Sequence, residues 1–200
     1  MKWLLAYICT ACLLLSISSD AQNSAYLDSL KNFRSNYIES HEVITGNERS
    51  NLQFFPIDEK YRVLASTERI FDAPWFNIET SSGRPRVYRT YAVIHFSIDG
   101  TKYKLQVYQS KELLNNSQYA DYLILPFTDL TCGNETYENG RYIDLTTGLL
   151  EAETVIIDFN KAYNPYCAYI SNRYSCPIPP KENSLPVAIK AGEKKYGEAH

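Results

Sequence analysis

The chain has 200 residues, of which 20 are basic and 23 acidic, giving a net charge of −3, and 14% of the residues are aromatic. This length predicts one domain with a sizeable apolar core. The mildly acidic balance, without any basic run, argues against nucleic acid as a partner, because binding to phosphate backbones depends on clustered Lys and Arg side chains.

The N-terminal stretch is typical of a secretory signal. Lys2 precedes an apolar run over residues 3–17, and Ser19 and Ala21 place small residues three and one before a cleavage point. The run is shorter than the roughly 20 apolar residues that span a bilayer. We therefore expect residues 1–21 to be removed, leaving a periplasmic or secreted chain over residues 22–200 without a membrane span.

A long helix is predicted over residues 23–39. Its apolar side chains recur three and four positions apart, which places them on one stripe, while the opposite face is charged. The stripe consists of Tyr26, Leu30, Phe33 and Tyr37. A stripe of this kind docks on the sheet of its own domain or, as the alternative, on a partner protein.

The clearest local signal is a β-hairpin. Asp99-Gly100 lies between two alternating runs, residues 87–98 and 101–109, and this composition favours a two-residue turn with both residues at positive φ. The turn sets a register in which facing positions sum to 199, so one face is apolar. That face pairs Phe96 with Tyr103, Ile94 with Leu105 and Ala92 with Val107.

On the other face of this hairpin His95 lies beside Lys104, and Ser97 and Val93 face Lys102 and Gln106. We expect a solvent-facing histidine there, with nothing adjacent to hold its tautomer.

Short strands are expected at residues 62–68, 75–80, 122–125 and 154–159, with a further pairing of residues 137–145 across Gly140. These elements predict a mainly β fold with an N-terminal helix, in the form of a single-domain antiparallel β-sandwich or partly open barrel. From Asn160 onward five prolines forbid a central strand. A long irregular C-terminal segment follows from this, and its aromatic and cysteine content indicates that it is packed.

Two groups of residues carry a resemblance to a known family. The first contains Ile157-Asp158-Phe159-Asn160, Ala162-Tyr163-Asn164-Pro165, Cys167-Ala168-Tyr169, Cys176-Pro177, Pro179-Pro180, Glu182-Asn183, Leu185 and Ala191-Gly192-Glu193; the second contains Asp129, Thr131, Gly133, Thr136-Tyr137 and Gly140-Arg141-Tyr142. With these residues the chain resembles the bacterial and archaeal family known as domain of unknown function 1684. The resemblance implies no activity, and it assigns no role to Cys132, where the family pattern does not call for cysteine.

Polar side chains follow two of the expected strands, where loops gather at strand ends. We expect six of them to line a pocket for a small polar ligand: Asp129, Arg141, Tyr142, Asp158, Asn160 and Asn164. Sixteen of the 17 tyrosines lie after residue 21, and tyrosine offers flat apolar area with a polar hydroxyl. The leading interpretation is an exported binding module, with an envelope interaction module that uses the helix as one alternative.

A second alternative is a hydrolase, because glycoside or ester hydrolysis needs two carboxylates in different environments. The candidates are Asp129, Glu135, Asp158 and Glu182. A structural interpretation competes with both, in which Asp129 and Asp158 cap turns through backbone amides and Arg141 pairs with one of them. The sequence does not decide whether the chain is an enzyme, and it indicates no cofactor.

Three cysteines remain after signal removal. Cys167 and Cys176 are interpreted as a disulfide or as packed free thiols, with metal binding or catalysis as the remaining option. The histidines, His41, His95 and His200, are scattered without ligand spacing. No metal site is therefore predicted.

Overall fold

The computed structural model describes residues 24–197, which fall into two compact units that meet between Ser40 and His41 in the sequence. In the first unit residues 24–40 form a helix, so the helix expected over residues 23–39 is confirmed apart from Asn23, which lies outside the described residues. The signal segment over residues 1–21 also lies outside them. Within residues 24–197 no helix has the length and apolar character needed to cross a membrane.

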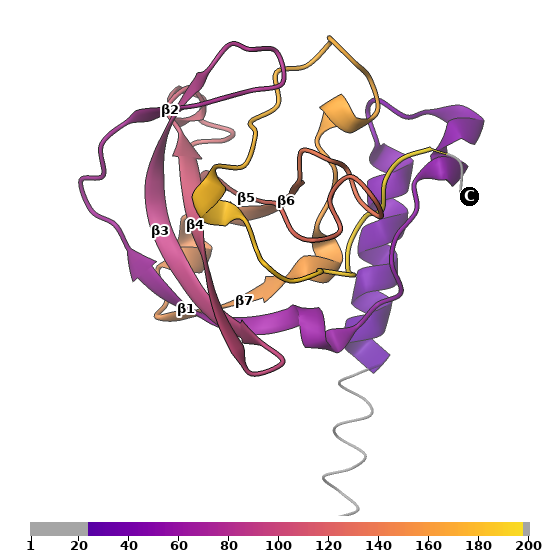
Figure 1. The fold of residues 1–200 in the computed structure, drawn as a ribbon, viewed down its shortest axis with the longest axis horizontal. Helices are drawn as coiled ribbons and strands as arrows, with labels where there is room; N and C mark the ends of the chain where they lie inside the picture. Colours follow the sequence, from indigo (N-terminus) through magenta and orange to yellow (C-terminus); the bar gives the residue numbers. More distant parts are fainter. Residues whose placement is uncertain (1–23, 198–200) are drawn as a thin grey trace, which may run out of the picture. The chain divides into compact units, whose positions relative to one another are not determined.

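The second unit is built on a seven-stranded antiparallel sheet that curves into a half-barrel (Figure 1). The strand order is β6-β5-β4-β3-β1-β7, and β2 pairs with β3 beside this path. The strands are β1 (Arg62–Arg69), β2 (Phe76–Ile78), β3 (Arg86–Ile98), β4 (Thr101–Ser110), β5 (Tyr122–Phe127), β6 (Arg141–Thr146) and β7 (Thr154–Asp158). The predicted mainly β fold is confirmed, and of the two expected architectures the partly open barrel is the one observed.

Short 3-10 turns connect the strands and occupy the C-terminal segment. They are η1 (Gly46–Asn51), η2 (Glu59–Tyr61), η3 (Leu113–Asn115), η4 (Gly148–Leu150), η5 (Phe159–Lys161), η6 (Tyr166–Ala168) and η7 (Lys181–Asn183). After β7 the chain therefore has short turns and isolated bridges in place of long elements, as expected from its prolines.

The β3-β4 hairpin has the predicted turn and register. Asp99 and Gly100 have φ values of 49° and 77°, which is the left-handed conformation that this composition favours. Phe96 faces Tyr103, and the register continues to Ala92 opposite Val107, where a bulge begins. The turn chemistry alone was sufficient to place these side chains.

Two local expectations were wrong. Residues 137–145 do not pair across Gly140, because Gly140 (φ 84°) closes a turn with Tyr137 and the next residues, β6, pair with β5 instead. His95 is exposed, as expected, but it does have a neighbour that can hold its tautomer, since its Nε2 lies 3.0 Å from the Glu68 carboxylate on β1. Both contacts involve a strand that is distant in sequence, which local patterns cannot supply.

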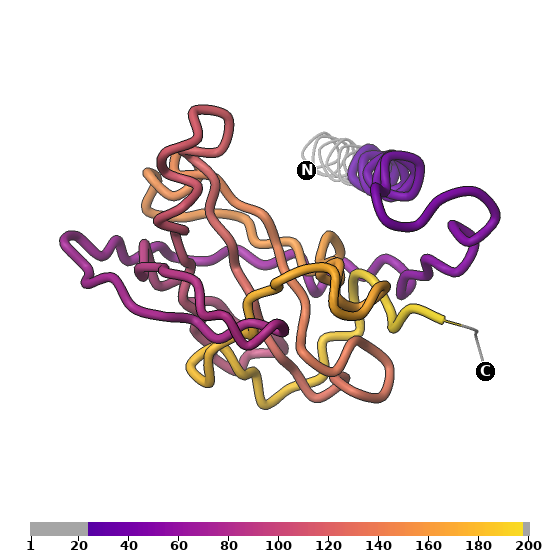
Figure 2. The backbone as a smooth tube through the Cα atoms, turned by 90° about the horizontal axis from the view of Figure 1, so that it is seen from above, coloured from indigo at the N-terminus to yellow at the C-terminus, as the bar shows by residue number. Residues whose placement is uncertain are grey.

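The inner face of the half-barrel packs a continuous apolar core with side chains from most of the strands. The C-terminal segment contributes Leu185, Ile189 and Ala191 to this core, and all three are buried. Figure 2 shows the segment in yellow as it returns past the loop that follows β5. The irregular segment is thus packed, and it covers part of the core on the side where the half-barrel has no strands.

The segment enters the sheet where β4 and β5 separate. These strands pair at Tyr108 and Ile124, and beyond that point Pro126 has no amide hydrogen to donate. The Asn183 side chain takes the place of a strand there: its Nδ2 donates to the carbonyls of Gln106 (2.8 Å) and Pro126 (2.6 Å). Its Oδ1 accepts from the Gln106 amide at 2.8 Å. One amide side chain therefore satisfies three backbone groups that the split would leave unpaired.

Near its end the segment passes very close to the turn after β7. Gly192 has φ 76°, and a Cβ at this position would lie 2.5 Å from the Ala162 carbonyl oxygen and 2.8 Å from that of Phe159. Both the conformation and the space therefore require glycine.

We predict that Gly192→Ala lowers the free energy of unfolding by about 3 kcal/mol or more, because it adds backbone strain and a clash with two carbonyl groups. Gly46→Ala is the matched control: Gly46 also has a positive φ of 58°, but a Cβ there meets nothing within 4 Å. It should cost about 1–2 kcal/mol, the strain alone. Urea unfolding followed by circular dichroism measures both, and equal losses would contradict the close approach.

Candidate functional site

All six residues predicted to bind a ligand are buried in the second unit: Asp129, Arg141, Tyr142, Asp158, Asn160 and Asn164. They occupy several environments with different partners. The partners in each environment decide what each residue can do.

Asp129 and Arg141 form a fully buried ion pair. Arg141 Nη2 donates to Asp129 Oδ2 at 2.8 Å, and neither side chain is exposed to solvent. The guanidinium also donates to the carbonyl oxygens of Ile189 (2.9 Å), Ala191 and Glu193 (3.3 Å). Asp129 Oδ1 accepts from the Thr131 amide at 2.8 Å and from the Ile189 amide at 3.3 Å. The pair thus holds the C-terminal segment against β6.

Asp158 and Asn160 connect the end of β7 to the loop before β1. Asp158 Oδ1 accepts from the backbone amide and from Nδ2 of Asn160, both at 3.0 Å. The Asn160 side chain also exchanges two hydrogen bonds with the backbone of Asp58, at 2.9 and 3.1 Å. These contacts cap one turn and attach another segment to it.

Asn164 belongs to a group around Glu193, a fully buried carboxylate that the sequence did not single out for a role of its own. Glu193 Oε2 accepts from the Asn164 amide at 2.8 Å, and Oε1 accepts from the Tyr169 hydroxyl at 2.6 Å. Asn164 Nδ2 donates to the Lys194 carbonyl at 2.8 Å. This group also fixes the C-terminal segment.

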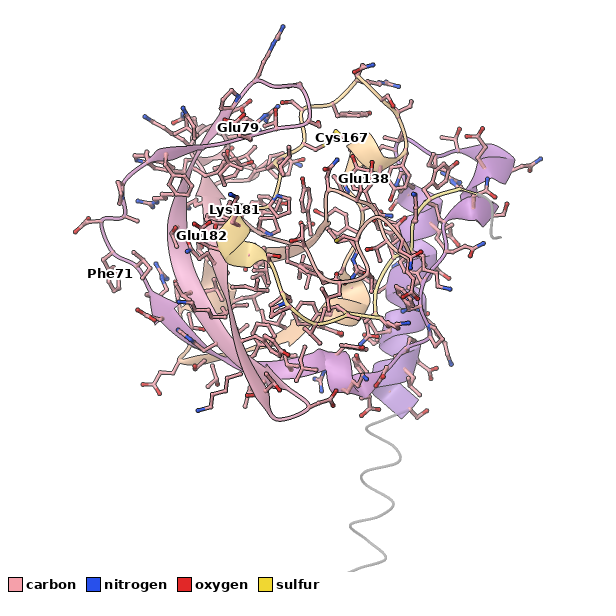
Figure 3. All side chains as sticks on the ribbon, viewed as in Figure 1. Phe71, Glu79, Glu138, Cys167, Lys181 and Glu182 are labelled. Carbon is pink, nitrogen blue, oxygen red and sulfur yellow. A yellow bond between two sulfur atoms is a disulfide. The ribbon has the colours of Figure 1, made fainter. Side chains whose placement is uncertain are left out.

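The structural interpretation of the sequence is therefore the arrangement observed: Asp129 and Asp158 cap turns, and Arg141 pairs with Asp129. The ligand-binding role of the six residues stays a prediction. Of the other two carboxylates considered for hydrolysis, Glu135 pairs with Lys190 at 3.0 Å near the surface, and Glu182 lies on η7, as Figure 3 shows.

The structure joins Cys167 and Cys176 in a disulfide with a Cα–Cα distance of 6.3 Å. Cys132 is a free thiol, and its sulfur accepts from the Asp129 amide at 3.4 Å. The disulfide closes the loop that begins at Cys167, labelled in Figure 3.

A different group of side chains, on the opposite face of β6 from Arg141, has the properties of a site. A second apolar cluster forms on this face, with tyrosines from β3, β4, β5 and β6 and from the segment after β7. We name part of it the tyrosine-aspartate cluster, which consists of Tyr88, Tyr122, Tyr142, Tyr163 and the neighbouring Asp144.

Asp144 is the charged member of the cluster. The hydroxyl of Tyr122 donates to its Oδ1 at 2.7 Å, and the hydroxyl of Tyr163 donates to the same oxygen. Its Oδ2 accepts no hydrogen bond from the described residues. The residue as a whole lies exposed at the surface, while the neighbouring tyrosines partly desolvate its carboxylate. A fixed carboxylate therefore presents one open oxygen.

The surroundings of Asp144 perturb its ionisation. Burial raises the pKa of Asp144, and the hydrogen bonds from Tyr163 and Tyr122 lower it without cancelling the effect. Burial, followed by the charge of Asp144, raises the pKa of Tyr122 well above its usual value. Burial also raises the pKa of Tyr163 and of Tyr142. These tyrosines are consequently protonated donors at neutral pH.

Sequence reasoning missed Asp144 because a single acidic residue in a strand is typical of a solvated face. The signal that was available is the alternation in Tyr142-Ile143-Asp144, which places Tyr142 and Asp144 on the same face of a strand. The contributions of Tyr122 and Tyr163 carry no local signal.

A separate feature is an open hollow of about 550 Å³ on β1, β3, β4 and β7. It is lined by residues that include Leu64, Ser66, His95, Ser97, Lys102 and Thr154. None of the six sequence-predicted residues lies in it.

Comparison with known proteins gives a family and a fold relative. Residues 48–194 match the model of a family described as "Protein of unknown function (DUF1684)". A solution NMR structure of the uncharacterized protein from gene locus rrnAC0354 of Haloarcula marismortui is similar, with a TM-score of 0.65 and 31% sequence identity. The similarity covers 88% of this chain and 97% of that one. No curated protein matches the chain.

We predict that Arg141→Met lowers the free energy of unfolding by about 3–5 kcal/mol, because it leaves the Asp129 charge buried without compensation. Arg86→Met is the matched control, since Arg86 pairs with Glu112 at 3.1 Å on the surface, where such a pair contributes about 0–1 kcal/mol. Urea unfolding midpoints measure both losses. A loss at Arg141 no larger than that at Arg86 would show that the buried pair does not hold the fold.

We predict that Asp144→Asn increases stability at neutral pH. Asparagine keeps an acceptor oxygen for both tyrosines but carries no desolvated charge. Because the pKa of Asp144 is raised above its unfolded value of 3.8, the folded state binds more protons between the two pKa values. The contribution of Asp144 to stability therefore falls as pH rises through this window and stays low above it.

The measurement is the difference in urea midpoint between Asp144→Asn and the wild-type protein across that pH range, with Asp121→Asn as an exposed control. The difference should grow with rising pH for Asp144→Asn and stay flat for the control. Lower stability of Asp144→Asn at neutral pH would contradict the prediction.

Proposed function

Because the chain belongs to the DUF1684 family, which is described only as of unknown function, we propose its function from geometry: an exported domain that binds a small polar ligand at the tyrosine-aspartate cluster. One observation carries this proposal. The Asp144 carboxylate is held by two tyrosine hydroxyls at one oxygen, its other oxygen has no hydrogen-bond partner within residues 24–197, and the residue is exposed.

The energetic argument concerns desolvation. A carboxylate whose pKa is raised by burial costs free energy in the folded state, and two tyrosine hydrogen bonds offset only part of that cost. Perturbed groups of this kind concentrate at functional sites. A ligand that donates to the open oxygen would offset the rest of this desolvation cost.

Rigidity supports the same proposal. Asp144 and Tyr122 lie on adjacent paired strands, β6 and β5, and Tyr163 bonds through its backbone to Tyr142 in both directions, at 2.9 and 3.0 Å. The polar atoms are therefore positioned before a ligand arrives, which reduces the entropy lost on binding.

Of the six residues that the sequence indicated, Tyr142 belongs to this cluster. Its hydroxyl donates to the Pro177 carbonyl of the C-terminal segment. The other five residues support the site indirectly, by fixing that segment and the turn after β7. In this proposal they position the framework, and the ligand contacts the tyrosines and Asp144.

Binding is favoured over hydrolysis by the partners of Asp144. Acid-base catalysis with two carboxylates requires a second acidic group facing the first. In the described part of the chain both hydrogen-bond partners of Asp144 are tyrosines, whose raised pKa values make them poor bases at neutral pH.

Export is supported by two features. Residues 1–21 have the composition of a secretory signal. Cys167 and Cys176 form a disulfide, and disulfides persist in oxidising compartments outside the cytoplasm.

Native mass spectrometry tests both parts of the proposal. The full chain is produced in a bacterium with a functional export pathway and purified without denaturation. We expect the mass of a chain that begins at residue 22, less two hydrogens for the disulfide, together with a bound small molecule. The molecule should be absent from Asp144→Asn and present in the control Glu153→Gln, which removes an exposed carboxylate.

The outcomes separate the two parts. An unprocessed N-terminus in the purified protein contradicts export. Retention of the small molecule by Asp144→Asn, or no bound molecule even after incubation with the small-molecule fraction of a cell extract, contradicts the binding site.

A further inference from the structure

The hydrogen-bonding groups of the tyrosine-aspartate cluster restrict the chemistry of its ligand. Each tyrosine has one hydroxyl proton to donate. Tyr122 and Tyr163 both donate to Asp144 Oδ1, and Tyr142 donates to the Pro177 carbonyl. Three hydroxyl protons are thus already committed within the protein.

At Asp144 itself, the groups left for a ligand are acceptors. Asp144 Oδ2 accepts nothing from the described residues, and an ionised carboxylate has no hydrogen to donate. The Tyr122 hydroxyl oxygen retains lone pairs after donating its proton. A ligand that itself offers only acceptors, such as a carboxylate or a phosphate, would leave Asp144 unpaired and repelled.

The charges around the cluster also favour a positively charged ligand over a negatively charged one. Burial and then the Glu182 carboxylate raise the pKa of Tyr108 on the adjacent strand β4. Burial also raises the pKa of Tyr88. The charge of Arg86 lowers this pKa, and the charge of Glu112 raises it. Since Arg86 is itself paired with Glu112, its positive charge is largely compensated.

We infer that the tyrosine-aspartate cluster recognises a protonated primary amine or a guanidinium group on a small molecule. The N–H groups donate to Asp144 Oδ2 and to the Tyr122 hydroxyl oxygen, and the charge rests among the tyrosine rings, whose faces attract cations. The inference rests on the proposed function and specifies its ligand class. A quaternary ammonium carries the charge without N–H donors, so it should fit less well.

A metal ion is a poorer fit than an organic cation. Calcium takes six to eight oxygen ligands and magnesium requires an octahedral set. Within residues 24–197 no group of three or more His, Cys, Asp or Glu side chains is placed to hold a metal ion. One open carboxylate oxygen beside aromatic rings suits a cation that brings its own donors.

The test is isothermal titration calorimetry of the processed, disulfide-bonded protein with five probes of one chain length: butylammonium, butylguanidinium, butyltrimethylammonium, butyrate and butanol. We expect the first two to bind and the quaternary probe to bind on the order of 10-fold more weakly, the cost of losing charged hydrogen bonds. Butyrate and butanol should not bind measurably.

Variants locate the binding and control for folding. Asp144→Asn should weaken butylammonium binding roughly 10- to 100-fold, and Tyr122→Phe should weaken it to a smaller extent, while Glu153→Gln leaves it unchanged. Urea midpoints of all three variants show whether they remain folded. Binding by the wild-type protein should also weaken as pH falls through the raised pKa of Asp144, because protonation removes the charge.

The results distinguish the inference from the function on which it rests. If butyrate or butanol binds and Asp144→Asn abolishes that binding, the cation inference is overturned and the site stands. If butyltrimethylammonium binds as tightly as butylammonium, the donor argument is overturned. If neither butylammonium nor butylguanidinium binds, the inference fails, and the native mass spectrum decides separately whether the protein holds a ligand.

Discussion

The buried ion pair between Asp129 and Arg141 is the interaction on which the rest of the second unit depends. The guanidinium donates to the carbonyls of residues 189, 191 and 193 as well as to Asp129. Alternate carbonyls of an extended segment point to the same side, so one planar side chain can satisfy a whole edge of it. The side chain thereby holds in place a segment that lies outside the named strands. The cost of burying the two charges is offset because nearly all their polar atoms have partners.

The anchored segment connects the framework to the candidate site. Arg141 and Tyr142 are adjacent on β6, so their side chains point to opposite faces of the sheet. Arg141 contacts the end of the segment, near Ala191, and Tyr142 contacts its earlier part, at Pro177. Asn183 lies between these two contacts and fills the split between β4 and β5. Loosening of the segment would therefore remove a contact of the tyrosine-aspartate cluster, the hydrogen bond from Tyr142 to Pro177.

The buried carboxylates differ from Asp144 in their hydrogen-bond partners. Asp129, Asp158 and Glu193 are buried and accept hydrogen bonds from backbone amides of the turns and segments around them. They therefore act as structural groups. In the described part of the chain, one oxygen of Asp144 has no hydrogen-bond partner, and the residue is exposed. Polarity in the sequence does not distinguish these cases. The Haloarcula marismortui protein, with 31% identity over 97% of its length, shares the fold.

The sequence by itself determined the features that depend on neighbouring residues. The Asp99-Gly100 turn set the β3-β4 register, the prolines after Asn160 predicted an irregular segment, and the turn-capping interpretation of Asp129 and Asp158 was correct. The tertiary structure alone decided the pairing of β6 with β5, the insertion of Asn183 and the meeting of Tyr122, Asp144 and Tyr163. These contacts join segments far apart in the chain, and they form because buried backbone and hydroxyl groups must find partners wherever the fold places them.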